Sequence, residues 1–197
     1  MKYDPTHKQP RGIVRTQRAF SDAMFGLLAQ KPFEKITVNE LCQLADYPRA
    51  TFYNYFDDKY DLIGYCWYCL SKEIHLTDLQ EHPQEGALLE LFAQTYRVFA
   101  AHQPLLLAIV AQNPLDSQLV ANFLHHFAGV VEDLIVTRLR LQDTVTPVAL
   151  VAKHYSNTVL LILEWIFLDQ HEATLAEAED YLKDLLTPPA QHAISND

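Results

Sequence analysis

The sequence predicts an all-α fold, in which a three-helix N-terminal domain is followed by an all-α domain of about six helices. In every strong segment the apolar residues recur at spacings of three and four, as they do on the buried face of a helix. Two Thr-x-x-Glu capping boxes, at Thr37 and Thr174, open two of these segments. Beyond the N-terminal domain, no segment has the alternation of a strand or a glycine-rich phosphate loop.

The first predicted helix ends before Pro32 and supports the next two. Its apolar residues recur at helical spacing: Ala19, Phe20, Ala23, Met24, Leu27 and Leu28. The capping box of Thr37 and Glu40 opens a second helix, with an apolar face of Val38, Leu41, Cys42 and Ala45. Residues 46–48 interrupt it, because aspartate tolerates the left-handed conformation of a helix end and proline suits the start of a new helix. A third helix therefore begins near Arg49.

The third predicted helix carries side chains suited to DNA. Phe52 and Phe56 lie four residues apart and can both face inward. The remaining surface then carries polar, charged and aromatic side chains: Arg49, Thr51, Tyr53, Asn54 and Tyr55. Arginine pairs with guanine or phosphate, asparagine pairs with adenine, and hydroxyl groups reach phosphate oxygens. These residues indicate either a recognition helix for the major groove or an ordinary amphipathic helix in a helical hairpin.

A longer pattern runs from the third helix into the next, Thr-Phe-Tyr-x-x-Phe-x-x-Lys-x-x-Leu, matched by Thr51, Phe52, Tyr53, Phe56, Lys59 and Leu62. With the capped helix and the turn before it, this pattern resembles the TetR family of bacterial transcription regulators over residues 11–65. The resemblance implies a ligand-responsive DNA-binding regulator, most often a homodimeric repressor and less often an activator. It also implies a DNA face lined by Thr37, Arg49, Ala50, Thr51, Tyr53, Asn54, Tyr55 and Lys59, with Lys59 meeting a phosphate.

Two features depart from the family pattern. Pro48 stands where a small hydroxyl residue is usual, and Asp57 and Asp58 stand where a basic or neutral residue is common. Both acids could repel phosphate, but they are also good N-caps for the helix that opens at Lys59, with Asp61 completing the capping pattern. If the acids do repel DNA, the chain is a helical protein-interaction module that no longer binds DNA. A helical enzyme is the third alternative.

The net charge of −10 is concentrated away from this pattern. Residues 1–65 hold nine Lys and Arg against eight Asp and Glu, whereas residues 66–197 hold six against seventeen. Because DNA affinity depends on cations placed on phosphates, an acidic excess in the second part does not exclude DNA binding by the first. Lys8, Arg11 and Arg15 form a basic arm, which either contacts DNA or is a solvated tail.

Six helices are predicted after the third, of which the first is a connector at about residues 59–75. Thr146 and Pro147 form a cap and first-turn pair, and Thr174 with Glu177 forms the second capping box. The other five helices lie at about residues 88–99, 105–110, 116–141, 147–169 and 174–185. The predicted domains are a DNA-binding domain at 1–58, a regulatory and dimerisation domain at 59–189 and a tail at 190–197.

Residues 159–168 are apolar nearly all round, so this helix must bury two faces. One face packs on its own domain, and a second copy of the chain is the simplest cover for the other; a monomeric core helix is the alternative. The resemblance implies that the last two helices pair into a four-helix bundle. Two recognition helices related by a two-fold axis would read a palindrome with half-sites about one helical turn apart or a little more.

By the same resemblance, an unknown small-molecule effector binds in a pocket among the C-terminal helices. The candidate lining is Trp67, Tyr96, His125, Tyr155 and Trp165, with core packing as the alternative role of each. No cofactor, metal site or catalytic residue is predicted. Cys66 and Cys69 lie inside a predicted helix and not at its N-terminus, where a thiolate would be stabilised. His125 and His126 point about 100° apart on a helix, so they do not form a metal site together.

No segment is predicted to cross a membrane, because the most apolar run, residues 159–168, contains Glu164 and has about half of the length that a bilayer requires. The N-terminus lacks a signal-peptide core. Three cysteines in a chain of this size fit a reducing compartment without disulfides. The cytoplasm is therefore the expected location.

Overall fold

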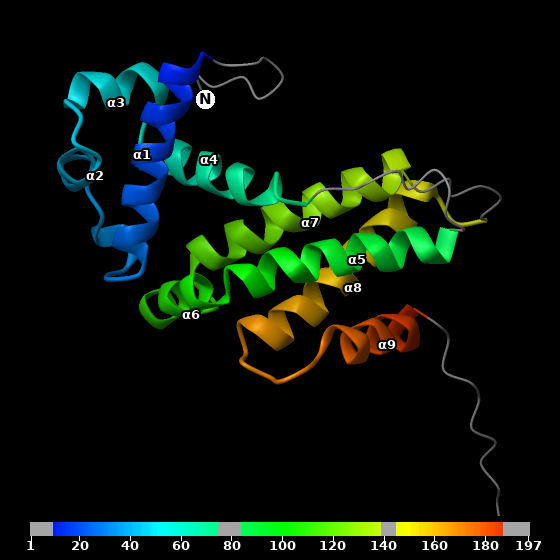
Figure 1. Cartoon of the computed structure of the whole chain (residues 1–197). Coiled ribbons are helices and arrows are strands. Elements are labelled where there is room, and N and C mark those ends of the chain that lie inside the picture. Colours follow the sequence, from blue (N-terminus) through cyan, green and yellow to red (C-terminus); the bar gives the residue numbers. More distant parts are fainter. Residues whose placement is uncertain (1–9, 75–83, 139–144, 187–197) are drawn as a thin grey trace, which may run out of the picture. The chain divides into compact units, whose positions relative to one another are not determined.

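The computed structural model describes residues 10–74, 84–138 and 145–186, and all regular elements in these ranges are helices (Figure 1). They are α1 (Arg11–Leu28), the 3₁₀ helix η1 (Phe33–Lys35), α2 (Val38–Ala45), α3 (Arg49–Tyr55), α4 (Lys59–Ser71), α5 (Gln84–Ala101), α6 (Gln103–Gln112), α7 (Gln118–Arg138), α8 (Val148–Phe167) and α9 (Leu175–Leu186). The all-α prediction is confirmed, with three α-helices before Lys59 and six from there on within the described residues.

The described chain divides into two compact units. One contains the residues up to 73 together with 102–126, and the other contains residues 74–101 together with those from 127 onwards. The first unit therefore includes α4 and α6 besides the three N-terminal helices. The predicted domain limits at 1–58, 59–189 and 190–197 stay a prediction, and the predicted tail lies outside the described residues.

An aromatic core holds the first unit together. Phe20 of α1 and Phe52 of α3 are fully buried and meet edge to face, with 5.3 Å between their ring centroids. Phe56, also fully buried, lies 6.1 Å from Phe20. Burial of each ring contributes about 1.5 to 3 kcal/mol to folding. The predicted inward orientation of Phe52 and Phe56 is confirmed, and α1 packs against α2, α4 and α6.

The predicted end of the first helix before Pro32 is confirmed, whereas the predicted basic arm and the predicted end of the fourth helix are wrong. α1 begins at Arg11, so Arg11 and Arg15 belong to a helix and not to a basic arm, while Lys8 lies outside the described residues. The buried face of α1 starts with the polar residues Thr16 and Gln17, which an apolar pattern cannot reveal. α4 ends at Ser71 and not near residue 75.

The predicted cap of the helix at residues 147–169 is also wrong. Pro147 occupies the N-cap of α8 in place of Thr146, and the cap residue supplies no side-chain hydrogen bond. The reason lies in the backbone, since Pro147 has an extended ψ of 132° and the helix starts only at Val148.

The second unit is built around α5, α8 and α9, which pack against one another. Tyr96 of α5 meets the Phe167 ring edge to face at 5.0 Å and donates its hydroxyl to the Ala173 carbonyl at 2.9 Å. At the start of α9, the Glu177 carboxylate accepts from the amide of Thr174 at 2.8 Å and from its hydroxyl at 2.7 Å. The second predicted capping box is therefore confirmed.

In the part of the chain that the structure describes, one helix, α7, is long and apolar enough to cross a membrane, since Gln118–Thr137 has a mean hydropathy of 1.4. The prediction that no segment crosses a membrane rested on residues 159–168 and did not consider this helix, and it stays a prediction. A core helix of a soluble protein passes the same test, and α7 buries one set of apolar side chains: Leu119, Val120, Phe123, Phe127, Val131 and Ile135. Glu132 and Asp133 also lie within the segment, and charges are costly in hydrocarbon.

Candidate nucleic-acid interface

The turn between α2 and α3 has the geometry that a helix-turn-helix requires. Asp46 ends α2 with a φ of 57°, in the left-handed region, and the Tyr47 amide donates to the Cys42 carbonyl at 3.1 Å. Aspartate enters this conformation more readily than most residues. Pro48 then stands at the N-cap of α3 with an extended ψ of 151°, so the chain passes from one helix to the next within three residues.

The capping box at the start of α2 is confirmed and involves a third residue. The Glu40 amide donates to the Thr37 hydroxyl oxygen at 3.3 Å, and the Thr37 amide donates to Glu40 Oε2 at 3.0 Å. Lys31 donates to the other carboxylate oxygen. The hydrogen bond from Lys31, followed by those from Thr37, lowers the pKa of Glu40 to about 2. Thr37 therefore stands at an exposed helix N-terminus, where amides and the helix dipole favour a phosphate.

The outer side of α3 carries four of the predicted contact residues, all exposed: Arg49, Ala50, Tyr53 and Asn54. They share one side of the helix, away from the buried Phe52. Arg49 Nη2 donates to the Tyr53 hydroxyl at 3.1 Å, which orders the two side chains together. Thr51 and Tyr55 are half-buried on the flank of this side. The structure thus gathers six of the predicted residues on one short helix with a polar outer surface.

Lys59 has partners within its own unit. Its ammonium nitrogen donates to three backbone carbonyl oxygens, those of Phe33 at 2.9 Å, Glu34 at 3.0 Å and Ile36 at 3.2 Å. An ammonium group has three donors, and these bonds use all of them. The predicted contact of Lys59 with a phosphate stays a prediction, in competition with these carbonyls.

One of the two acidic residues after α3 caps the next helix. Asp58 is the N-cap of α4, and its Oδ1 accepts from the amides of Tyr60 and Asp61, each at 2.8 Å. Asp61 Oδ2 accepts from the Asp57 amide at 3.1 Å. The predicted capping role is confirmed for Asp58, with Asp61 completing the pattern, and their negative charge complements the positive end of the α4 dipole; for the Asp57 side chain it stays a prediction.

The five predicted pocket residues are divided between the two units. In the first unit, Trp67 is buried and its indole N–H has no hydrogen-bond partner among the described residues, whereas His125 is exposed. In the second unit, Tyr96 bonds a carbonyl, Tyr155 is half-buried and Trp165 is 39% exposed. The predicted effector pocket stays a prediction.

Cys66 and Cys69 lie within α4 in surroundings that disfavour the thiolate. Cys66 is fully buried and its sulfur accepts from the Ser21 hydroxyl at 3.3 Å. Burial raises the pKa of both thiols, so neither is an activated nucleophile in this conformation. Within the described ranges, no group of three or more His, Cys, Asp or Glu residues is placed to hold a metal ion.

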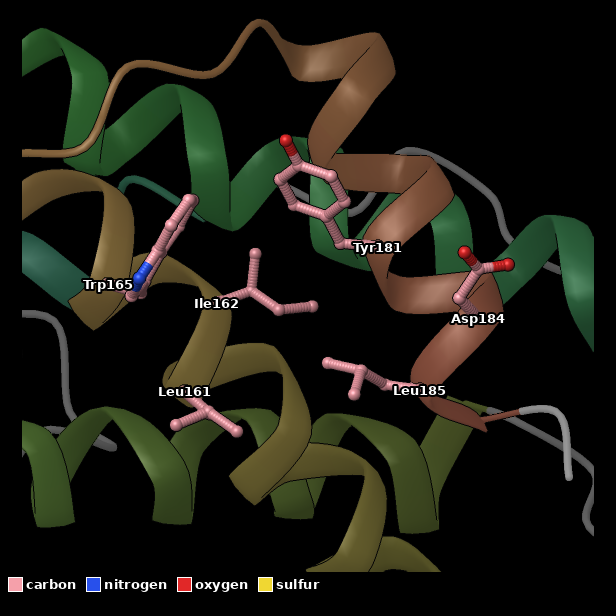
Figure 2. A pocket seen from close by; sticks show the side chains of 6 residues that line it. All are labelled: Leu161, Ile162, Trp165, Tyr181, Asp184 and Leu185. Atoms are coloured by element: carbon pink, nitrogen blue, oxygen red, sulfur yellow. The ribbon is translucent and has the colours of Figure 1, made fainter. Parts of the chain in front are cut away.

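A hollow of about 450 Å³ opens on α8 and α9 in the second unit (Figure 2). α8 supplies one side of it and α9 the other, and the lining residues are Leu161, Ile162, Trp165, Tyr181, Asp184 and Leu185. Leu161 and Leu185 are exposed over 57% and 53% of their surfaces. Since only Asp184 in this lining is charged, the two helices present an apolar surface here.

The α9 side of this hollow is absent from the predicted residues, although a signal for it exists. Tyr181 and Leu185 lie four residues apart on α9, as do the buried Ala178 and Leu182 on its other side. α9 thus has two apolar sides. Asn113 is also absent from the predicted residues. No local sequence pattern indicates its role, because its side chain accepts from the Phe33 amide, 80 residues away in the sequence.

Comparison with known proteins agrees with this geometry. Residues 22–66 match the family profile described as "Bacterial regulatory proteins, tetR family". No curated protein sequence matches the chain.

Three solved structures share the fold over nearly the whole chain. A TetR-family regulator from Streptomyces coelicolor A3 has a TM-score of 0.68 and 13% identity, with 91% of this chain and 97% of that one covered. A TetR transcriptional regulator from Streptococcus agalactiae has a TM-score of 0.61 and 22% identity, with 89% and 96% covered. The regulator FadR from Bacillus subtilis, in complex with stearoyl-CoA, has a TM-score of 0.54 and 17% identity, with 86% and 97% covered.

Proposed function

This chain belongs to the TetR family of bacterial regulatory proteins, and we propose that it is a homodimeric, ligand-responsive transcriptional repressor that binds a palindromic operator. DNA-binding transcription regulation is the function that the family match and the similar structures share. The observation that carries the proposal is the donor-rich outer side of α3, which stands on a fully buried aromatic core.

The proposed reading surface is α3 with the N-terminus of α2. Arg49 carries paired donors, and Asn54 carries a donor and an acceptor. Both side chains are exposed, as base reading in the major groove requires. Tyr53, held by Arg49, has a hydroxyl suited to a phosphate. The proposed contact set is Thr37, Arg49, Ala50, Thr51, Tyr53, Asn54 and Tyr55. Lys59, which the family pattern adds to this set, is left out of it because its ammonium group already donates to three backbone carbonyls.

The hollow on α8 and α9 supports the proposed dimer. Single exposed apolar side chains are ordinary, but an apolar surface shared by two adjacent helices marks an interaction site. A second copy of the same surface is its simplest occupant, because a two-fold interface is self-complementary. Such a dimer carries two copies of α3 about one axis, which supports a palindromic operator with half-sites about one helical turn apart or a little more.

An effector can act on this dimer only by binding one of its arrangements better than another. The usual coupling is about 1 to 3 kcal/mol, or about 5- to 150-fold in DNA affinity. The indole N–H of Trp67 is buried and has no partner among the described residues, which supports a site of this kind, because such a donor is costly unless a water or a ligand accepts from it. Stearoyl-CoA, bound in the FadR structure, is one compound to test.

The proposal places the protein in the cytoplasm with its DNA and gives it no catalytic activity. A second candidate function, a helical protein-interaction module without DNA binding, is favoured by one observation. Asp57 and Asp58 are exposed next to the C-terminal end of α3, where two carboxylates would approach the phosphates.

Selection from a pool of random DNA duplexes, at a series of salt concentrations, tests the proposal. We expect an enriched palindrome whose affinity falls as salt rises, with a slope in log units of about −0.9 for each phosphate that is neutralised. Weak binding without sequence preference would contradict the proposal and support the protein-interaction module.

A further inference from the structure

The short helix η1 leads directly into the helix-turn-helix. It ends at Lys35, Ile36 is extended with a ψ of 132°, and Thr37 is already the N-cap of α2. Only one residue therefore separates η1 from the cap of α2. A displacement of η1 moves the start of α2 with it.

The N-terminal end of η1 is capped by a residue of α6. The first amides of a helix have no partner within it, and Pro32 at the N-cap supplies no side-chain hydrogen bond. Asn113, at the C-cap of α6, fills this role: its Oδ1 accepts from the Phe33 amide at 2.8 Å. Asn113 is only 4% exposed, and its Nδ2 donates to the Ile109 carbonyl at 3.0 Å. Both ends of the Asn113 amide are thus used.

The C-terminal end of η1 is capped by a residue of α4. Lys59 donates to the Phe33, Glu34 and Ile36 carbonyls, and its nitrogen also lies 4.6 Å from the centroid of the buried Phe33 ring. The three carbonyls surround one ammonium group, which suits a compact donor better than a planar guanidinium.

We propose that Asn113 and Lys59 are positioning residues that clamp η1 between α6 and α4, and thereby set the position of the helix-turn-helix for DNA. The inference rests on the proposed function for its DNA readout, but the clamp itself is independent of DNA.

Hydrogen exchange tests the clamp directly. In Asn113→Ala the Phe33 amide loses its acceptor, so exchange at Phe33 and along α2 and α3 becomes about 5- to 30-fold faster, while α1 stays unchanged. Asn122→Ala is the matched control, because Asn122 Oδ1 accepts from Gln118 on the exposed side of α7 in the same unit. Unchanged exchange in α2 and α3, or an equal rise in all helices, would overturn the proposal.

Asn113→Asp separates the clamp from general packing. This variant keeps an acceptor for the Phe33 amide and loses the donor to Ile109, so we expect protection at Phe33 to be retained. Equal loss of protection in Asn113→Asp and Asn113→Ala would overturn the proposal, since it would mean that the amide matters only as a packed group.

DNA affinity tests the consequence. On the duplex selected by the unaltered protein, Asn113→Ala should bind about 5- to 30-fold more weakly with the same salt slope, because no phosphate contact is lost. Unaltered affinity together with fast exchange in α2 and α3 would overturn the positioning role. If the unaltered protein selects no duplex, the proposed function is wrong. The hydrogen-exchange data alone then test whether Asn113 and Lys59 hold η1 in place.

Lys59→Arg and Lys59→Met distinguish the clamp from a phosphate contact. For a positioning residue, both variants weaken DNA binding to a similar extent with the salt slope unchanged, because arginine keeps the charge but not the compact donor. For a phosphate contact, Lys59→Arg binds normally and Lys59→Met lowers the slope by about 0.9. The second result would overturn the role of Lys59 in the proposal.

Discussion

The helix-turn-helix and the last two helices differ in how far their large apolar side chains are exposed. Around α3 the phenylalanine rings are covered by the chain itself, with Phe20, Phe52 and Phe56 at 0% exposure, and the polar side chains and the Tyr53 ring face outward. On α8 and α9, Leu161, Trp165 and Leu185 remain exposed over 57%, 39% and 53% of their surfaces. The first region is thus complete as a folded unit, whereas the second leaves an apolar surface to be covered.

This contrast shows how a regulator of this fold can use one region for DNA reading and the other for association. A rigid core can present polar side chains to DNA without a partner, because its stability comes from rings that are already buried. An uncovered apolar surface is best used by association, since burying it removes apolar area from water. We therefore expect substitutions in the first region to affect folding and DNA reading, and those in the second to affect assembly.

The largest expected effect comes from the aromatic core. Phe52→Ala should lower the free energy of unfolding by about 3 to 5 kcal/mol, because it leaves a cavity among rings that cannot all collapse. Leu44→Ala is the control: Leu44 is 58% exposed on α2, and its loss should change stability by less than about 0.5 kcal/mol. Chemical denaturation followed by circular dichroism measures both. Similar losses in the two variants would contradict the assignment of the core.

The next effect concerns assembly. Leu161→Glu should weaken self-association by about 2 kcal/mol or more, or about 30-fold, because it places a charge in the apolar hollow. Leu150→Glu is the matched control on the same helix, since Leu150 is 58% exposed but does not line the hollow. Sedimentation equilibrium over a range of concentrations gives the dimer constants. A Leu161→Glu protein as dimeric as the unaltered one would show that the hollow is not the interface.

A smaller effect is expected in DNA reading. Asn54→Ala should lose about 1 to 3 kcal/mol of discrimination at the base that Asn54 reads, with folding unaffected because the side chain is exposed. Competition with duplexes altered at each operator position measures it. An equal loss on every sequence would mean that Asn54 contacts only the backbone.

The smallest expected effect is a difference between the two capping boxes in how their stability depends on pH. The two boxes have the same Thr-x-x-Glu pattern and lie one in each region. Hydrogen bonds lower the pKa of Glu40 from 4.5 to about 2, with Lys31 as the largest cause, and the Thr174 amide and hydroxyl lower the pKa of Glu177. A lowered pKa gives stability that is present above pH 4.5 and is lost as pH falls towards about 2. Glu40→Gln should therefore reduce acid sensitivity in this range more than Glu177→Gln does, in denaturation curves at several pH values. The reverse order would contradict the role of Lys31.

The sequence predicts the first region better than the second because its signals are local. The capping box at Thr37, the turn at Asp46 and the spacing of Phe52 and Phe56 each act within a few residues, and all are confirmed. The apolar pattern of α1 begins only at Ala19 because the first buried residues of this helix, Thr16 and Gln17, are polar.

Long-range contacts could not be predicted in the same way. The bond from the Phe33 amide to Asn113 joins residues 80 positions apart, and Asn113 before Pro114 reads as an ordinary end of a helix. The carbonyl partners of Lys59 depend on the path of η1, whereas the sequence pattern suggested a phosphate. The pattern of residues 159–168 indicates two apolar faces but does not say what covers the outer one.

One comparison tests whether the surface on α8 and α9 pairs two recognition helices. It measures the affinity of the unaltered protein and of Leu161→Glu for the selected palindrome and for a duplex with a single half-site. We predict that Leu161→Glu loses at least about tenfold in affinity for the palindrome at low protein concentration, while both proteins bind the half-site equally. If Leu161→Glu binds the palindrome as tightly as the unaltered protein does, the surface on α8 and α9 does not pair the two recognition helices, and the proposed dimer is wrong.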